Sequence, residues 1–321
     1  MNKKILVHGS FAIDYIMDFN GNLYDNVHID HESRSFEMAV MPSTKRMQFG
    51  GTAGNIAYNL GLLEAPAVIL GSVGVDFKTL KYEQHLKTFK SLILNLERHS
   101  NDFCANCYIV NDKKSHQLII YHGGVTNIVP SKSLKERIKN IDEISIAINS
   151  PENPQLMFKL SNELKQSKIK NILDTGQVTP YFSREQFEIM IKNSDILICN
   201  ENEYNIICQK VDLTDEEVFE YLKAIVRTEG ARGSTLFFKD KKIKIPSVQP
   251  KKVLDPTGAG DAFRAGFLYA LYLEKTLEDA CKLGATVSSF VVETIGAQTH
   301  KFSKEELIER YEKNFGKFIF N

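Results

Sequence analysis

Short apolar runs alternate along this chain with segments of helical periodicity, and that alternation narrows the folds it can adopt. The apolar runs suit strands that are covered on both faces, and a helical pattern follows most of them. Such an order predicts βαβ units and a mainly parallel sheet. The strand-like runs are 3–9, 67–73, 144–148, 171–174 and 195–199, and helical patterns cover 55–63, 80–96, 153–166, 183–193 and 214–228. The last third predicts a hairpin at 235–248 and helices at 260–273, 276–292 and 304–315.

Two segments break the alternation. Residues 11–49 are largely polar with scattered aromatics, and residues 102–124 predict two short strands around a turn at 111–113. Neither contains a helical pattern of useful length. We therefore expect one α/β domain over 1–321, with a small β-sheet outside it built from about 12–49 and 102–124. Such a sheet suits a lid over a site or a clasp between two subunits.

The bulk composition is that of an ordinary globular protein. Forty basic residues balance forty acidic ones, so overall charge indicates neither a nucleic-acid nor an anionic-membrane partner. No apolar stretch is long enough to cross a bilayer. Two lysines precede the first apolar run, as in a signal peptide, but the run ends at His8-Gly9 and fits a buried strand better. These features predict a cytoplasmic protein.

Five cysteines, an odd number, argue against a disulfide framework. Cys104 and Cys107 form a lone C-x-x-C, which is typical of a redox pair or of half a zinc site. No second pair accompanies them, so a zinc site is disfavoured. The flanking residues predict a strand, on which positions three apart face opposite sides. Two separate strand thiols are the preferred interpretation.

The sharpest motif is the sequence DPTGAGDAF at 255–263, directly before a helical pattern. Gly258, Ala259 and Gly260 are small enough for the N–H groups of a helix N-terminus to converge on an anion. Asp261 would lie at the start of that helix, where the dipole and free N–H groups favour the ionised carboxylate. Phosphoryl transfer needs such a cradle and a carboxylate that accepts the proton of the attacking hydroxyl. Taken alone, the motif could also be an ordinary loop with Asp261 as a helix cap.

Three further motifs accompany it in a fixed order. GGTAGNIAYNLG at 50–61 places a glycine pair before an asparagine on a helix, NENE at 200–203 follows a strand, and TEGARG at 228–233 forms a glycine-containing loop. Together with 255–263 they resemble the signatures of the PfkB-type carbohydrate and nucleoside kinases, the ribokinase-like family, across nearly the whole chain. The resemblance implies a three-layer α/β/α fold with a mostly parallel central sheet and a small β lid. No Walker-type G-x-x-x-x-G-K-[ST] sequence occurs.

The resemblance also implies roles for particular residues. Asp261 is the expected catalytic base, beside the cradle of Gly258, Ala259 and Gly260. ATP and Mg²⁺ are the expected cofactors, and a K⁺ site is implied near the cradle. The acceptor would be held by Asp14, Gly50, Gly51 and Asn55; ATP would contact Asn200, Thr228, Gly230 and Gly233; Glu203 would hold Mg²⁺ through water; and Asp255 and Thr257 would bind the monovalent cation.

The acceptor is the least determined element. The stretches 9–14, 255–267 and 289–299 most resemble the bacterial and archaeal adenosine or nucleoside kinases of this family. A purine needs flat apolar walls, and Phe103 and Tyr121 in the second excursion could supply them or could simply pack within the lid. Ile120 stands beside Tyr121, where an aromatic residue would favour base stacking. A sugar kinase of the ribokinase or fructokinase kind and a non-catalytic sensor are the alternatives, and a homodimer through the lid is expected.

Overall fold

The computed structural model describes residues 3–30, 32, 34–114, 116–211, 218, 220–238 and 241–317. Within them, the largest sheet has the strand order β15-β14-β13-β12-β11-β10-β1-β6-β7. The strands from β7 to β13 pair in parallel, whereas β13, β14 and β15 are antiparallel. Their bounds are β1 Lys4–His8, β6 Ala67–Val73, β7 Leu92–Arg98, β10 Ile144–Asn149, β11 Lys170–Leu173, β12 Ile196–Asn200, β13 Ala224–Thr228, β14 Ser234–Phe238 and β15 Lys241–Ile245.

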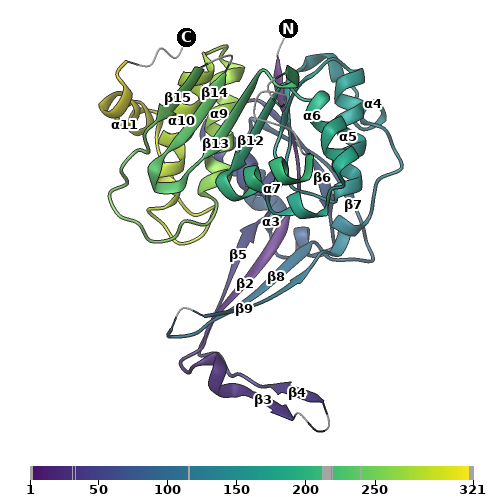
Figure 1. Ribbon diagram of the computed structural model, residues 1–321, viewed down its shortest axis with the longest axis vertical. Coiled ribbons are helices and arrows are strands. Elements are labelled where there is room, and N and C mark those ends of the chain that lie inside the picture. The colour runs from purple at the N-terminus through teal and green to yellow at the C-terminus, as the bar shows by residue number, and fades with distance from the viewer. Residues whose placement is uncertain are drawn as a thin grey trace.

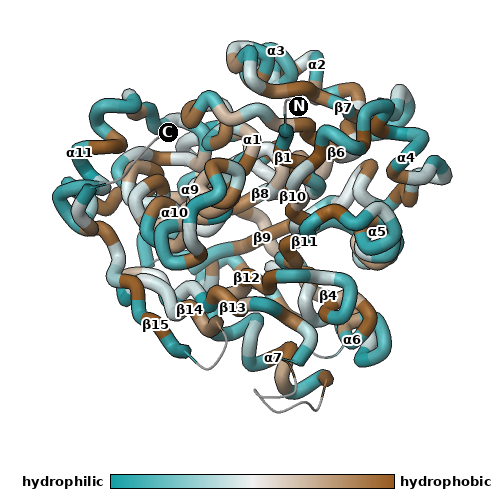
Figure 2. The backbone as a smooth tube through the Cα atoms, turned by 90° about the horizontal axis from the view of Figure 1, so that it is seen from above, coloured by the Kyte–Doolittle hydropathy of each residue, from teal (hydrophilic) through white to brown (hydrophobic). Residues whose placement is uncertain are grey.

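Helices cover both faces of this sheet (Figure 1). On β1, Ile5 and Val7 belong to the core beneath one helical layer, and Leu6 belongs to a core on the opposite side. Seen from above, the two helical layers lie on opposite sides of the strands (Figure 2). One layer contains α1 Thr52–Leu62, α9 Ala259–Tyr272, α10 Leu277–Val291 and α11 Lys304–Phe315; the other contains α4 Leu134–Arg137, α5 Pro154–Gln166, α6 Arg184–Lys192 and α7 Glu201–Val211.

A small sheet projects from the body (Figure 1). Its order is β5-β2-β8-β9, and β2 pairs in parallel with β8 while the outer pairs are antiparallel. Beyond it, β3 and β4 form a two-stranded hairpin at the far end of the projection. The bounds are β2 Ala12–Asp18, β3 Val27–Asp30, β4 Ser35–Met38, β5 Thr44–Gly50, β8 Ala105–Asn111 and β9 Gln117–His122.

Two helical predictions were wrong in part. The segment 80–96 contains α3 (Tyr82–Leu86) but then β7, an edge strand of the main sheet. Part of the segment 214–228 lies outside the described residues, and its end is β13 rather than helix. In 80–96 the polar residues of the edge strand β7 mimic a helical spacing, whereas β13 is an internal strand with buried residues. In both places sheet pairing overrides the local pattern.

The five cysteines are free thiols. Cys104 is buried just before β8, where its sulfur accepts a hydrogen bond from the Gly74 N–H, and burial raises the pKa of this thiol. Cys107 is half-buried within β8. Among the residues described, no helix has the length and apolar character needed to span a membrane.

The topology gathers the motif residues at one edge. Parallel strands end together, and an open α/β sheet binds ligands outside the carboxyl ends of its strands. The segment after β1 leads directly into β2, so the small sheet rises from that edge. The loops after β11, β12 and β13 and the start of α9 reach the same side.

Candidate active site

Asp261 and Asn55 meet although 206 residues separate them in sequence. α1 and α9 pack together, and Asn55 Nδ2 donates a hydrogen bond to Asp261 Oδ2 at 2.7 Å. α9 begins after Gly258, which adopts φ +80°. A side chain does not fit at this position, because its Cβ would lie 2.5 Å from the Cβ of Ala297. Asp261 therefore sits in the first turn of α9 with one carboxylate oxygen oriented by an amide.

The carboxylate of Asp261 lies among charged groups, on a residue that is partly buried. Burial raises its pKa to about 7, although Arg264 and the Asn55 amide act in the opposite direction. Asp174 and Glu203 add smaller upward contributions. A carboxyl group whose pKa lies near neutrality is well matched to general-base work, because it holds a transferred proton better than an ordinary aspartate does.

Asp14 lies over the glycine pair. A Cβ at Gly50 would lie 2.5 Å from Asp14 Oδ2, so a side chain there would displace this carboxylate. Gly51 adopts φ +84° and approaches the backbone around Ser10. Burial raises the pKa of Asp14 to about 6. The glycine pair thus forms a floor on which a substrate can come close to this carboxylate.

Tyr82 and Gln298 support the floor from below, and neither was a predicted site residue. Tyr82 donates to the Gly50 carbonyl at 2.8 Å, and Gln298 Nε2 donates to Asn55 Oδ1 at 2.9 Å and also to the Tyr82 hydroxyl. Asn55 is therefore fixed at both ends of its amide and keeps one free donor and one free acceptor position. Gln298 lies in the stretch 289–299 that resembled the nucleoside kinases, so a signal for it was present.

A groove of about 340 Å³ opens beside the cradle. It brings together the predicted nucleotide residues Thr228, Gly230 and Gly233 with Ala259 and Gly260. Its other walls are mainly apolar and come from the loop after β15, from α9 and from α10: Val248, Pro250, Val253, Pro256, Phe263, Ala285 and Val292. An apolar slot that ends at the N-terminus of a helix suits a nucleotide, with its base in the slot and its phosphates at the helix.

Asn200 and Glu203 begin α7 as a reciprocal cap. The Glu203 carboxylate accepts from the Asn200 N–H and from Asn200 Nδ2, both at 2.7 Å, and Asn200 Oδ1 accepts from the Glu203 N–H at 2.8 Å. Burial raises the pKa of Glu203, with a further contribution from Asp174. Capping therefore accounts for part of this motif, and the charge of Glu203 also acts on Asp261.

Asp255 ties two loops together. Its carboxylate accepts from the Thr257 N–H and from the Gly296 N–H, each at 2.9 Å. Burial acts to raise the pKa of Asp255, but these hydrogen bonds outweigh it and lower the pKa overall. The group is thus held ionised beside the loop carbonyls. Among the residues that the structure describes, no three His, Cys, Asp or Glu side chains cluster as metal ligands.

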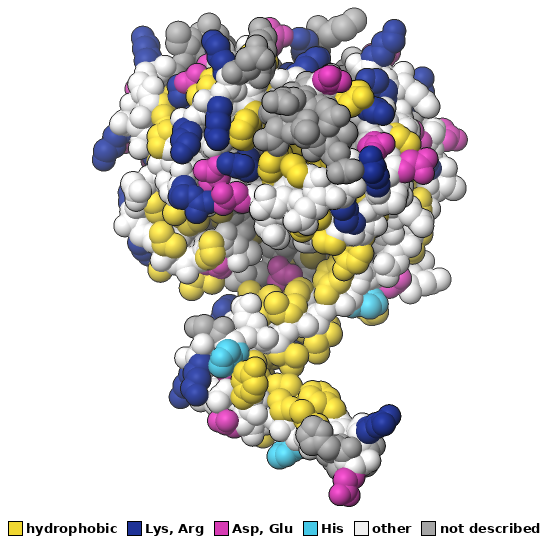
Figure 3. Space-filling model, viewed as in Figure 1, with side chains coloured by type: hydrophobic (Ala, Val, Ile, Leu, Met, Phe, Trp, Pro, Cys, Tyr) yellow, Lys and Arg dark blue, Asp and Glu magenta, His cyan; other side chains and the backbone are white. Residues whose placement is uncertain are grey.

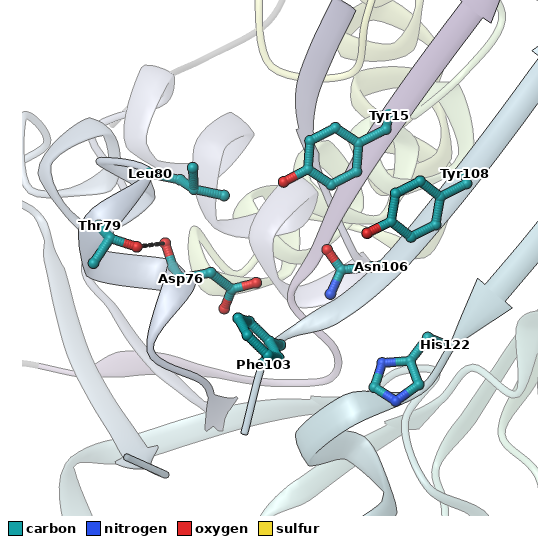
Figure 4. A pocket seen from close by; sticks show the side chains of 8 residues that line it. All are labelled: Tyr15, Asp76, Thr79, Leu80, Phe103, Asn106, Tyr108 and His122. Carbon is teal, nitrogen blue, oxygen red and sulfur yellow. Dashed lines mark hydrogen bonds between the residues drawn. The ribbon is translucent and has the colours of Figure 1, made fainter. Parts of the chain in front are cut away.

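Phe103 and Tyr121 lie on different sides of the small sheet. Tyr121 is opposite Cys107, which is opposite Asp14, so these three share a face. Phe103 instead lines a cavity of about 350 Å³ with Tyr15, Asn106, Tyr108 and His122, residues that alternate onto the other face (Figure 4). The structure therefore does not bring Phe103 together with Asp14.

The fold and this site define a class: α/β kinases in which a helix-terminal cradle and a carboxylate lie beneath a small sheet. A sequence model described as "pfkB family carbohydrate kinase" matches residues 4–304, and the chain belongs to that family. It is an ATP-dependent phosphotransferase that acts on a hydroxyl group. The predicted family, fold class and type of reaction are confirmed.

Among its relatives, the nucleoside kinase of Methanocaldococcus jannaschii is 31% identical over 97% of this chain and 98% of its own length. The ribokinase of Bacillus subtilis is 26% identical over 81% and 86%. The crystal structure of the M. jannaschii enzyme has a TM-score of 0.85 at 28% identity, covering 98% of this chain and 99% of that one. Burkholderia thailandensis nucleoside kinase in complex with inosine has a TM-score of 0.79 at 28% identity, with 98% of each chain covered.

The assignment of Asp261 as the base predicts a defined pH dependence. As pH rises from 5 to 8, kcat/KM should rise, because the carboxyl groups of Asp14 and Asp261, with pKa values of about 6 and 7, must lose their protons.

Asp261→Asn keeps the shape and should lower kcat by about 10²–10⁴-fold, the usual contribution of a general base. Steady-state kinetics test both. A flat profile, or an Asp261→Asn enzyme that keeps more than about a tenth of the wild-type kcat, would contradict this role.

Proposed function

We propose that this enzyme transfers the γ-phosphate of ATP to the 5′-hydroxyl of a nucleoside, with purine nucleosides preferred. The observation that carries the proposal is the placement of Asp14 and the Asn55–Asp261 pair around a glycine floor, beneath a sheet face that presents Tyr121. Nucleoside kinases among the relatives support this choice, as do solved structures of one of them with inosine and with ADP-inosine.

The geometry supports a sequence of roles. Asp14 accepts hydrogen bonds from ribose hydroxyls, and the amide of Asn55 offers its free donor and acceptor to the same sugar. The attacking hydroxyl gives its proton to Asp261, on the carboxylate oxygen that Asn55 leaves open. The N–H groups of Gly258 and Gly260 stabilise the negative charge on the phosphoryl oxygens during transfer, whereas the Ala259 N–H donates to the Pro256 carbonyl. The nucleotide occupies the groove lined by Thr228, Gly230 and Gly233, with Asn200 close to the same edge.

The sheet formed by β2, β5, β8 and β9 acts as a lid in this scheme. The face it shares with Asp14 carries Cys107 and Tyr121, so we assign the wall for the base to Tyr121 and not to Phe103. A sugar would need hydroxyl ligands and no such wall. A sugar kinase remains the second candidate, since ribokinases are among the relatives.

An ATP-consumption screen over adenosine, guanosine, inosine, cytidine, ribose and fructose tests the acceptor. We expect a purine nucleoside to give the highest kcat/KM, with ³¹P NMR showing a 5′-monophosphate. Stacking on an aromatic ring contributes about 1–3 kcal/mol per base, so Tyr121→Ala should raise the nucleoside KM by about tenfold. Phe103→Ala, on the other face, is the matched control and should change KM little. Preference for ribose or fructose would select the second candidate instead.

Two cations complete the proposal. Glu203 would hold hydrated Mg²⁺, which neutralises phosphate charge during transfer and keeps much of its water shell in proteins. Asp255 and Thr257, with carbonyls near 293–296, would hold K⁺. The fit for K⁺ rests on Asp255, which precedes the groove residue Pro256 and is kept ionised by two backbone N–H groups.

Cation titrations test these assignments. Glu203→Gln should raise the Mg²⁺ concentration for half-maximal rate more than it raises the acceptor KM. Glu201→Gln is the control, since Glu201 is exposed and pairs with Arg232. Replacing Na⁺ by K⁺ should increase the rate. Equal rates in the two salts would contradict the K⁺ site. An unchanged Mg²⁺ requirement in Glu203→Gln would contradict the role of Glu203 in holding Mg²⁺.

We also propose that the projecting sheet pairs with that of a second copy of this chain. Apolar side chains gather on the projection (Figure 3), including Ile29, Phe36, Met41 and Ile120, each more than half exposed. A two-stranded hairpin such as β3–β4 has little stability by itself in water, so a partner surface would stabilise it.

Sedimentation equilibrium of the full chain tests this arrangement. We expect a dimer, and Phe36→Asp should shift the equilibrium toward monomer. Ile93→Asp is a control on the edge strand β7 of the main sheet, where Ile93 is 48% exposed. A wild-type monomer at micromolar concentration, or equal effects of the two variants, would count against the clasp.

A further inference from the structure

A buried ion pair lies behind the base. Arg264, one turn beyond Asp261 on α9, is 6% exposed, and Asp174, just after β11, is 1% exposed. Arg264 Nη2 donates to Asp174 Oδ1 at 2.7 Å, and Nε donates to the other carboxylate oxygen. This two-pronged contact fixes both the position and the plane of the guanidinium group.

The third branch of the guanidinium reaches the cradle. Arg264 Nη1 donates to the Gly260 carbonyl oxygen at 3.1 Å. That carbonyl belongs to the same peptide plane as the Asp261 N–H, so the contact orients the last peptide of the cradle. A Cβ at position 260 would lie 3.2 Å from Arg264 Nη1, a tight contact that would push the guanidinium away by a few tenths of an ångström.

A contribution to the stability of the fold is a weak explanation for this buried ion pair. A buried ion pair often contributes no more to folding than well-packed apolar residues of similar size would, since both charges lose their hydration. The pair instead adjusts the charges around Asp261. The groups that act on Asp261 are Arg264 on α9, Asp174 after β11, Glu203 on α7 and the amide of Asn55 on α1; the buried Tyr82 hydroxyl of α3 also senses its charge.

We propose that Arg264, clamped by Asp174, is a positioning residue for phosphoryl transfer: it fixes the Gly260 peptide of the cradle and supplies a positive charge that favours the ionised form of Asp261. The inference rests on the proposed role of Asp261 as the base. Arg264 touches neither the acceptor nor the phosphate in this scheme and acts through its two neighbours. Charge and clamping are separate contributions, and different substitutions remove them.

The test is the acid limb of the pH profile of kcat/KM. Arg264→Gln removes a positive charge and leaves Asp174 unpaired, so the limb should move to higher pH by about one unit, as expected for a neighbouring charge. Asp174→Asn removes a negative charge and leaves Arg264 in place, so the limb should move to lower pH. Both variants lose the same ion pair, so a merely structural role would not shift them in opposite directions.

Further variants make the outcome decisive. Arg264→Lys keeps the charge and loses the fork, so it should lower kcat with the limb near its wild-type position. Lys4→Gln breaks a half-buried ion pair with Glu143 at the amino end of the sheet and should leave the limb unmoved. If Arg264→Gln does not fold, the double variant Arg264→Met/Asp174→Leu replaces it, because it leaves no unpaired buried charge. That variant should fold and lose at least about tenfold in kcat, and wild-type kcat would overturn the proposal.

The proposal would also be overturned if the acid limbs of Arg264→Gln and Asp174→Asn moved in the same direction, or if neither limb moved. The wild-type profile and the Asp261→Asn variant separate this result from a failure of the proposed function. If wild type shows no acid limb, or if Asp261→Asn remains active, then Asp261 is not the base and the proposed mechanism itself fails. If both behave as expected and the Arg264 and Asp174 variants do not, then only the inference about Arg264 is wrong.

Discussion

The contact between Asn55 and Asp261 is the constraint on which the site depends. It requires the N-terminal ends of α1 and α9 to approach each other over the carboxyl edge of the sheet, and glycines make this possible at both ends. Gly51 and Gly258 adopt positive φ and leave no space for a Cβ. A side chain at either position would strain the backbone and move one helix end away from the other. The glycine motifs are therefore structural requirements of the carboxylate geometry as well as parts of an anion cradle.

That geometry brings acidic groups together at an electrostatic cost. Asp261, Asp14, Asp174 and Glu203 all lie in or near one crevice, and burial disfavours the charged forms of Asp261, Asp14 and Glu203. Hydrogen bonds from Asn55 and the Arg264 guanidinium offset part of this cost in the free enzyme. A polar acceptor or a cation that enters the crevice replaces lost hydration, so binding relieves an unfavourable arrangement that folding imposes. This is the usual reason that strongly shifted carboxyl groups collect where chemistry occurs.

Much of this could be read from the sequence, for physical reasons that differ between residues. The motif at 255–263 carries its own geometry, because small residues before a helix have few other uses, and the strands β1, β6 and β10 are apolar on both faces. The strands β7 and β13 were missed because pairing with neighbours, and not local pattern, makes them strands. The pairing of Asp174 with Arg264 could not be found, since 90 residues separate the two. Arg264 lies in the stretch 255–267 that resembles the nucleoside kinases, but Asp174 stands in no recognisable motif. Phe103 was grouped with Tyr121 because sequence proximity does not determine the side of a sheet.

The small sheet illustrates how one element can serve two surfaces. Alternation along β2 sends Asp14 toward the crevice and Tyr15 to the other side, where it stacks on Tyr108 at 5.0 Å. A single-residue change of register would exchange the two sets and remove the carboxylate from the site. The packing of Tyr15 with Tyr108, together with the buried Ile13 beside them, fixes that register. The aromatic residues on the outer face therefore determine where Asp14 points, although none of them lies on the same face as the acceptor site.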